Sequence, residues 1–90
     1  MQDKYKIAKE YRTKISKIEN RIHYFYAQRK KLIDNLKQTH IAYNKSEISR
    51  KSYLLYIKNP AVIAWIEHYE SKIYELYKKS TSYRKKLASI

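Results

Sequence analysis

The stretch YNKSEISRKSY, Tyr43–Tyr53, lies between two long segments with regularly spaced apolar residues, and it decides the fold that the sequence predicts. Ser49 is a good N-cap for a new helix, because its hydroxyl can accept a hydrogen bond from a free backbone N–H of the first turn. Ile48 before the cap and Tyr53 after it stand at the two positions of a hydrophobic staple. The sequence therefore predicts that one helix ends here and that another begins near Arg50.

Before this turn, residues spaced alternately three and four apart form an apolar seam across five heptads, which only Arg29 and Thr39 interrupt. This spacing is typical of a helix that packs along a partner helix. It predicts a helix over residues 4–43, about 60 Å long at 1.5 Å per residue. The apolar members of this first seam are Ala8, Tyr11, Ile15, Ile18, Ile22, Phe25, Leu32, Leu36 and Tyr43.

After the turn, Asn59 and Pro60 suit an N-cap followed by a proline at the first helical position, which predicts helices over 50–58 and 60–90. The three-four spacing nevertheless continues through Pro60 without losing phase, so one kinked helix and two separate helices both fit the sequence. The second seam consists of Ile48, Ser52, Leu55, Asn59, Val62, Ile66, Tyr69, Ile73, Leu76, Ser80, Tyr83, Leu87 and Ile90.

The two arms, 4–43 and 50–90, have nearly equal length and a short polar connection, which favours an antiparallel helical hairpin. The chain contains no glycine and one proline, so it cannot build many turns that need a positive φ. We therefore expect a single all-α domain over residues 1–90, packed as a dimeric helical bundle.

The segment Tyr53–Ile66 has one charged residue in fourteen, whereas 32% of the whole chain is charged. Its apolar residues occupy more than one seam, and one partner helix cannot cover them all. We expect a second copy of the chain to cover the remainder, through an interface formed by Tyr53, Leu54, Ile57, Ile63 and Trp65. The segment is shorter than the roughly twenty apolar residues that span a bilayer, so a membrane-spanning helix is not expected. Contact with a membrane surface and a binding pocket anchored by Trp65 are the alternatives.

The net charge is +13, from 21 Lys and Arg against 8 Asp and Glu. In an antiparallel hairpin, residues 1–21 and 78–90 share one end, which we call the basic pole. It carries +9 of the total charge, with Asp3, Glu10 and Glu19 as its acids. Its cations are Lys4, Lys6, Lys9, Arg12, Lys14, Lys17, Arg21, Lys78, Lys79, Arg84, Lys85 and Lys86.

A clustered basic surface is typical of proteins that bind the phosphate backbone of nucleic acids. Aromatic rings lie among these cations in the sequence and could stack unpaired bases: Tyr5, Tyr11 and Tyr83 at the pole, and Tyr24 and Tyr26 farther along. Tyr11 and Tyr83 also belong to the seams, and lysine-rich helix faces are often only solvated. The sequence contains no motif for specific bases, so we expect binding to DNA or RNA without sequence specificity, by a homo-oligomer.

The segment Arg12–Leu32, RTKISKIENRIHYFYAQRKKL, resembles the first helix of the all-helical chorismate mutases. In that family two arginines of this helix hold the substrate carboxylates, and Arg12 and Arg29 match them. The segment SEISRKSYLLYI resembles the start of the family's second helix, with Glu47 where an Asp is usual and Arg50 where an Arg is usual. The family's catalytic Lys is replaced by His40, and its Glu by Lys51. The resemblance implies an isomerase with a site formed by Arg12, Arg29, His40, Glu47 and Arg50.

Other chemistry is not indicated by the sequence. Cysteine is absent, and the three histidines, His23, His40 and His68, lack the spacing of a metal site, so we expect neither metal nor cofactor. The first twelve residues contain no apolar run typical of a secretory signal, which predicts an intracellular protein, cytoplasmic or nucleoid-associated. Three classes of function remain: a nucleic-acid-binding protein, a structural or interaction coiled coil, and a chorismate-mutase-like enzyme.

Overall fold

A computed structural model describes residues 3–90, so Met1 and Gln2 of the expected domain 1–90 lie outside the described residues. Within the described part the chain forms three helices and no strand: α1 (Lys4–Asn44), α2 (Arg50–Ile57) and α3 (Pro60–Ala88). The prediction of an all-α fold is confirmed. α1 is one residue longer than predicted, α2 is one residue shorter, and α3 ends two residues earlier.

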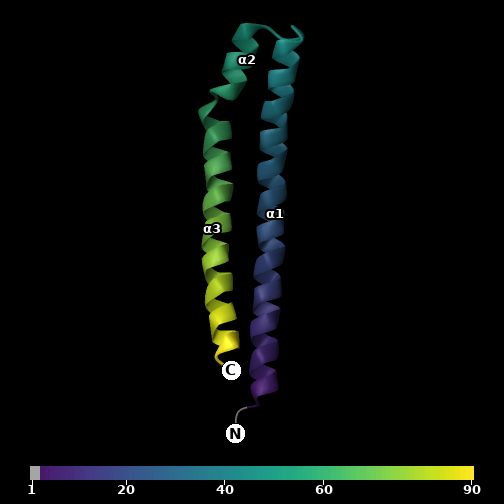
Figure 1. The fold of residues 1–90 in the computed structure, drawn as a ribbon. Coiled ribbons are helices and arrows are strands. Elements are labelled where there is room, and N and C mark those ends of the chain that lie inside the picture. Colours follow the sequence, from purple (N-terminus) through teal and green to yellow (C-terminus); the bar gives the residue numbers. More distant parts are fainter. Residues whose placement is uncertain (1–2) are drawn as a thin grey trace.

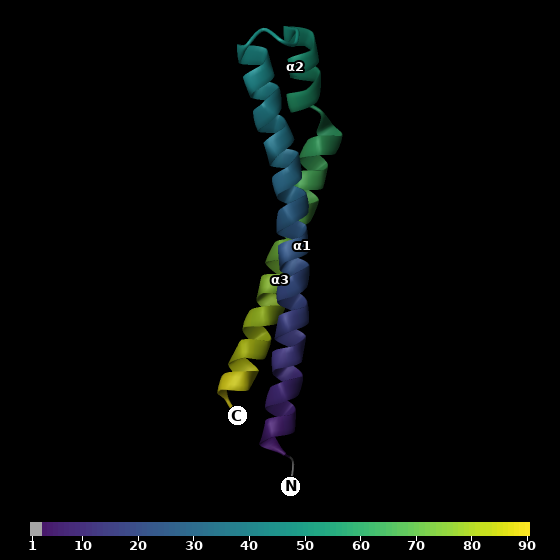
Figure 2. The same ribbon diagram turned by 90° about the vertical axis from the view of Figure 1, so that its right-hand side faces the viewer.

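The helices form two long arms that lie side by side and run in opposite directions (Figure 1). α1 is the first arm, and α2 followed by α3 is the second. Figure 2 shows that the arms cross at a shallow angle rather than lying strictly parallel. The molecule is a rod with extents of 70 × 19 × 14 Å, and both ends of the described chain lie at the same end of it.

Each helix begins at a side chain that accepts a hydrogen bond from a free backbone N–H. The carboxylate of Asp3 accepts from Tyr5 N at 2.9 Å, the hydroxyl of Ser49 from Ser52 N at 3.1 Å, and the amide oxygen of Asn59 from Ala61 N at 2.9 Å. Two of these caps, Ser49 and Asn59, are the ones that the sequence predicts.

The turn between the arms is built without glycine. Ser46 adopts a positive φ of 60°, and the N–H of Glu47 reaches back to the carbonyl of Ala42 at 2.8 Å. This bond satisfies one of the carbonyls left free at the end of α1. A serine in the left-handed region therefore reverses the chain where glycine is more usual.

Pro60 marks a break between two helices, which decides between the two alternatives that the sequence left open. The N–H of Asn59 bonds to the carbonyl of Tyr56 at 3.3 Å, and Lys58 and Asn59 belong to neither helix. Because proline lacks an N–H and clashes with the preceding turn, it begins α3 instead of continuing α2.

The core runs along the seam between α1 and α3. Its buried members are Ile15 and Ile22 of α1 and Ile73, Leu76 and Ser80 of α3. Every predicted seam position from Ala8 to Tyr43 is buried or half-buried. The ring centroids of Tyr11 and Tyr83 lie 5.9 Å apart across the arms, and those of Phe25 and Tyr69 lie 6.0 Å apart.

The predicted seam is wrong in α2. Leu55, expected to face the first arm, is 66% exposed, and Ser52 is exposed as well. Tyr53 faces α1 instead. Its ring stacks on the Tyr43 ring with the two centroids 4.3 Å apart, and its hydroxyl oxygen lies 2.7 Å from Nδ1 of His40. Since α2 is a separate helix, it is free to rotate out of phase with α3 and to bury the tyrosine. Ile90, the last predicted seam member, lies beyond the end of α3 and is 42% exposed.

Candidate nucleic-acid interface

The structure brings the two segments of the basic pole together at one end of the rod (Figure 1). Contacts across the arms join them, since Lys14 of α1 lies over the ring of Tyr83 and Arg84 of α3 pairs with Glu19. All twelve cations that the sequence assigns to the pole are exposed. Within residues 3–90, Arg84 is the only one of them in an ion pair with a carboxylate. The pole therefore presents nearly all of its positive charge to solvent.

Two of the tyrosines proposed for base stacking, Tyr11 and Tyr83, already contact other side chains of the protein. The Nζ atoms of Lys14 and Lys86 each lie 5.3 Å from the centroid of the Tyr83 ring, and Tyr11 packs against the same ring. The contact between Lys14 and Tyr83 crosses from α1 to α3 and stabilises the pairing of the arms, whereas Lys86 and Tyr83 belong to the same helix. Tyr11 and Tyr83 are half-buried members of the seam, as the sequence also allowed, and base stacking on them stays a prediction.

The exposed tyrosines form a different set. Tyr5 is 85% exposed, Tyr24 is 59% exposed and Tyr26 is 41% exposed, in line with their expected accessibility. The structure adds Tyr74, 62% exposed, and Tyr77, 49% exposed, which the sequence reasoning did not single out. Their spacing of three residues beside the seam position Ile73 was the signal that could have revealed them, because residues three apart share a helix face.

Tyr26, Tyr74 and Tyr77 line one continuous surface across both arms, which we call the tyrosine groove. A hollow of about 300 Å³ between the arms is lined by Tyr26, Arg29, Glu70, Ile73, Tyr74 and Tyr77. A second hollow, of about 440 Å³, continues along α3 toward the basic pole and is lined by Tyr74, Tyr77, Lys78, Thr81, Ser82 and Lys85.

Glu70, which lines this groove, and Glu19, whose charge acts on Tyr77, are both paired with arginines of the opposite arm. Oε1 of Glu70 accepts a hydrogen bond from Nε of Arg29 at 2.9 Å, and Glu19 is paired with Arg84. The neighbouring Tyr26 phenol raises the pKa of Tyr77 above its ordinary value, through a hydrogen bond and through charge repulsion between the ionised forms. The groove therefore carries little negative charge that would repel a phosphate.

The residues predicted to join two copies of the chain do not form one exposed surface. Tyr53 packs on α1, and Leu54 and Ile57 are half-buried, whereas Ile63 is 45% exposed and Trp65 is 54% exposed. Because Tyr53 already stacks on Tyr43, it has less surface to offer a second copy, and its place in the interface stays a prediction. Ile63 and Trp65 remain available to another molecule.

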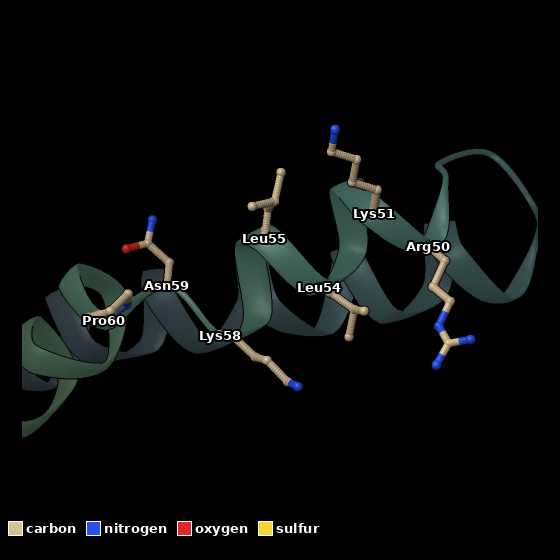
Figure 3. A pocket seen from close by; sticks show the side chains of 7 residues that line it. All are labelled: Arg50, Lys51, Leu54, Leu55, Lys58, Asn59 and Pro60. Atoms are coloured by element: carbon tan, nitrogen blue, oxygen red, sulfur yellow. The ribbon is translucent and has the colours of Figure 1, made fainter.

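A wide groove of about 770 Å³ lies along α2 at the end of the rod opposite the pole (Figure 3). Figure 3 shows Leu54 and Leu55 pointing to opposite sides of α2. The groove is lined by Arg50, Lys51, Leu54, Leu55, Lys58, Asn59 and Pro60. Three of these residues are cations. If two copies of the chain met through this groove, their like charges would lie close together and repel each other.

The residues that resemble a mutase site do not converge within one chain. Arg12 and Arg29 lie on the same helix, about 25 Å apart at 1.5 Å per residue. Arg29 forms an ion pair with Glu70, and His40 is hydrogen-bonded to Tyr53. Glu47 is exposed in the turn before α2. Arg50 is exposed at the start of α2 and lines the wide groove.

Residues 3–90 contain neither a cluster of metal ligands nor a membrane-spanning helix. No three carboxylate or histidine side chains among them come together as a group that could hold a metal ion. None of their helices is both long and apolar enough to cross a membrane. Comparison of the chain with models of protein families, with curated proteins and with solved structures gives no match.

Proposed function

We propose that this protein binds the phosphate backbone of nucleic acids, DNA or RNA, without sequence specificity and as a homo-oligomer. The observation that supports the proposal best is the gathering of twelve exposed cations from both arms at one end of a rod. Each cation that neutralises a phosphate releases a condensed counterion, which makes such binding favourable and strongly dependent on salt.

The positive charge is concentrated in one part of the rod. This uneven distribution favours a binding surface over lysine-rich helix faces that are only solvated. The stretch from Pro60 to Tyr77 contains three acids and one cation, whereas the pole carries +9. Because the pole carries +9 of the total +13, it attracts a polyanion more strongly than the rest of the molecule does.

The extent of the exposed surface supports self-association. The chain exposes 7309 Å². A compact monomer of the same mass, 11.0 kDa, exposes about 5,600 Å², so the rod exposes about 1,700 Å² more. If two copies each buried that excess, the interface would total about 3,400 Å², which lies within the range of obligate homodimers. The helical hairpin would then be one half of a dimeric bundle, with Ile63 and Trp65 of α3 in its interface.

Salt-dependent binding to oligonucleotides tests the proposed function. We expect the wild type to bind duplex and single-stranded oligonucleotides in filter binding at low salt. The logarithm of the binding constant should fall linearly with the logarithm of the salt concentration. Replacing five pole cations by glutamine should abolish measurable binding, because each lost phosphate contact removes part of the counterion release that favours it. The five are Lys78, Lys79, Arg84, Lys85 and Lys86.

A matched control removes the same charge from the other end of the rod. It replaces five exposed cations by glutamine, namely Lys37, Lys45, Arg50, Lys51 and Lys58, and should retain most of the affinity and of the slope. Equal loss in both variants would show that net charge alone acts and that the pole is not a site. Wild-type protein that binds no oligonucleotide at low salt, or binds with no dependence on salt, would leave a structural or interaction role in place of this proposal.

A further inference from the structure

The tyrosine groove combines exposed aromatic rings with lysines and continues into the basic pole. Tyr74 and Tyr77 of α3 and Tyr26 of α1 all present exposed rings at it. Lys78 and Lys85 line its continuation along α3 and belong to the pole. Rings and cations therefore form one surface, although they come from both arms.

We infer that the tyrosine groove binds single-stranded nucleic acid, with unpaired bases stacked on Tyr74 and Tyr77 and the adjoining phosphates on Lys78 and Lys85. This inference rests on the proposed function, which it deepens by naming the form of nucleic acid that the protein prefers. Stacking on tyrosine needs a base whose faces are free, and in a duplex the neighbouring base pairs cover them.

The geometry around Tyr74 suits this arrangement. The Nζ atom of Lys78 lies over one face of the Tyr74 ring, 4.4 Å from its centroid, so a base would stack on the other face of this residue, which is 62% exposed. A phosphate next to that base comes within reach of the same ammonium group. The hydroxyls of Thr81 and Ser82 line the groove farther along and can donate hydrogen bonds to phosphate or sugar oxygens.

The length of the groove fits a short strand. Tyr74 and Lys85 are eleven residues apart on α3, about 16 Å along the helix axis. The hollow between the arms extends the surface beyond Tyr74 to Tyr26 and Arg29. Glu70, which lines this hollow, is already paired with Arg29, and Glu19 is paired with Arg84, so a strand along this path would meet few unpaired carboxylates.

The test compares three ligands of equal charge. They are a single strand of about twelve nucleotides, within the usual range of site sizes, an abasic strand with as many phosphates, and a duplex with half as many base pairs. We expect the wild type to bind the single strand more tightly than the abasic strand, by about fivefold or more for each stacked base. The double variant Tyr74→Leu with Tyr77→Leu should lose this preference while its affinity for the abasic strand and the duplex stays unchanged.

Two controls separate stacking from other effects of the substitution. The variant Tyr74→Phe with Tyr77→Phe keeps both rings and should keep the preference for the single strand. The variant Tyr24→Leu removes a ring of similar exposure that lines neither hollow of the groove, and it should also keep the preference. Circular dichroism should show the same helix content in all variants, because the substituted side chains are exposed.

The outcomes distinguish this inference from the function on which it rests. If the wild type binds all three ligands equally and the leucine variant changes nothing, the groove does not stack bases, and backbone binding by the pole stands. If the wild type binds none of them at low salt, the proposed function fails and the inference fails with it.

Discussion

At the scale of single residues, the pairing of the arms depends on a few buried side chains. Ile22 and Leu76 are each 4% exposed and pack with Ile73 in one cluster, whereas Arg29 interrupts the same seam and is held by Glu70 at the surface. An exposed ion pair of this kind contributes about 0–1 kcal/mol. Burial of the aliphatic residues, and not the ion pair, therefore stabilises the contact between the arms.

Replacing Ile22 by alanine should reduce the free energy of unfolding by about 2–5 kcal/mol, because it removes buried methyl groups and leaves a cavity. The control Ile41→Ala changes a side chain of α1 that is 44% exposed and should cause a much smaller loss. Urea unfolding followed by circular dichroism, at one fixed protein concentration, measures both. Equal losses would contradict the position of the core.

At the scale of the helices, α2 is the weakest element. It has eight residues, none of them buried, between the Ser49 cap and the break before Pro60. An isolated helix of this length is not stable in water, so α2 depends on its cap and on its packing against α1. The stack of Tyr53 on Tyr43 and the contact between Tyr53 and His40 supply that packing.

Replacing Ser49 by alanine should destabilise α2 by about 0.5–2 kcal/mol, since the N–H of Ser52 loses its acceptor. Amide hydrogen exchange should speed up in Arg50–Ile57 and remain unchanged in the middle of α1. The control Thr13→Ala also removes a hydroxyl bonded to the backbone, but within a helix whose ladder is complete, and should leave exchange in α2 unchanged. Unchanged exchange in α2 of the Ser49 variant would show that the cap is not needed.

The helix boundaries and the core of α1 and α3 could be predicted from sequence, because caps, proline and a seven-residue spacing act locally. The rotation of α2 could not, since the side chain that it buries depends on Tyr43 of the other arm. The pairs Arg29–Glu70 and Glu19–Arg84 were also missed, as was the groove shared by Tyr26 and Tyr77. Each of them depends on how far one arm is shifted along the other, which a single sequence does not fix.

At the scale of the whole molecule, the chain is extended. Its radius of gyration is 20.0 Å, whereas a compact domain of ninety residues has about 12 Å. Two arms side by side leave the outer half of each helix in water, and this is why apolar side chains such as Ile63 and Trp65 stay exposed. A second copy is the most direct way to cover them.

Sedimentation at tens of micromolar should therefore give a mass above that of one chain. Ile63 and Trp65 are two residues apart and point to different sides of α3. The double variant Ile63→Glu with Trp65→Glu should shift the protein toward monomer, because it places a carboxylate on either side that a second copy could cover. The control Tyr5→Glu with Tyr24→Glu makes the same change of charge at exposed sites outside the expected interface. A folded wild-type monomer at these concentrations would contradict the homo-oligomer.

The position of the two chain ends affects how the protein should be labelled. Residues 3 and 90 both lie at the basic pole, and the turn around Ser46 lies at the other end of a rod 70 Å long. A purification tag or fluorescent protein fused to either end would sit over the cations and hinder the approach of a polyanion. A fluorophore attached at Ser46 would leave that surface open, so it is the better reporter for measuring affinity.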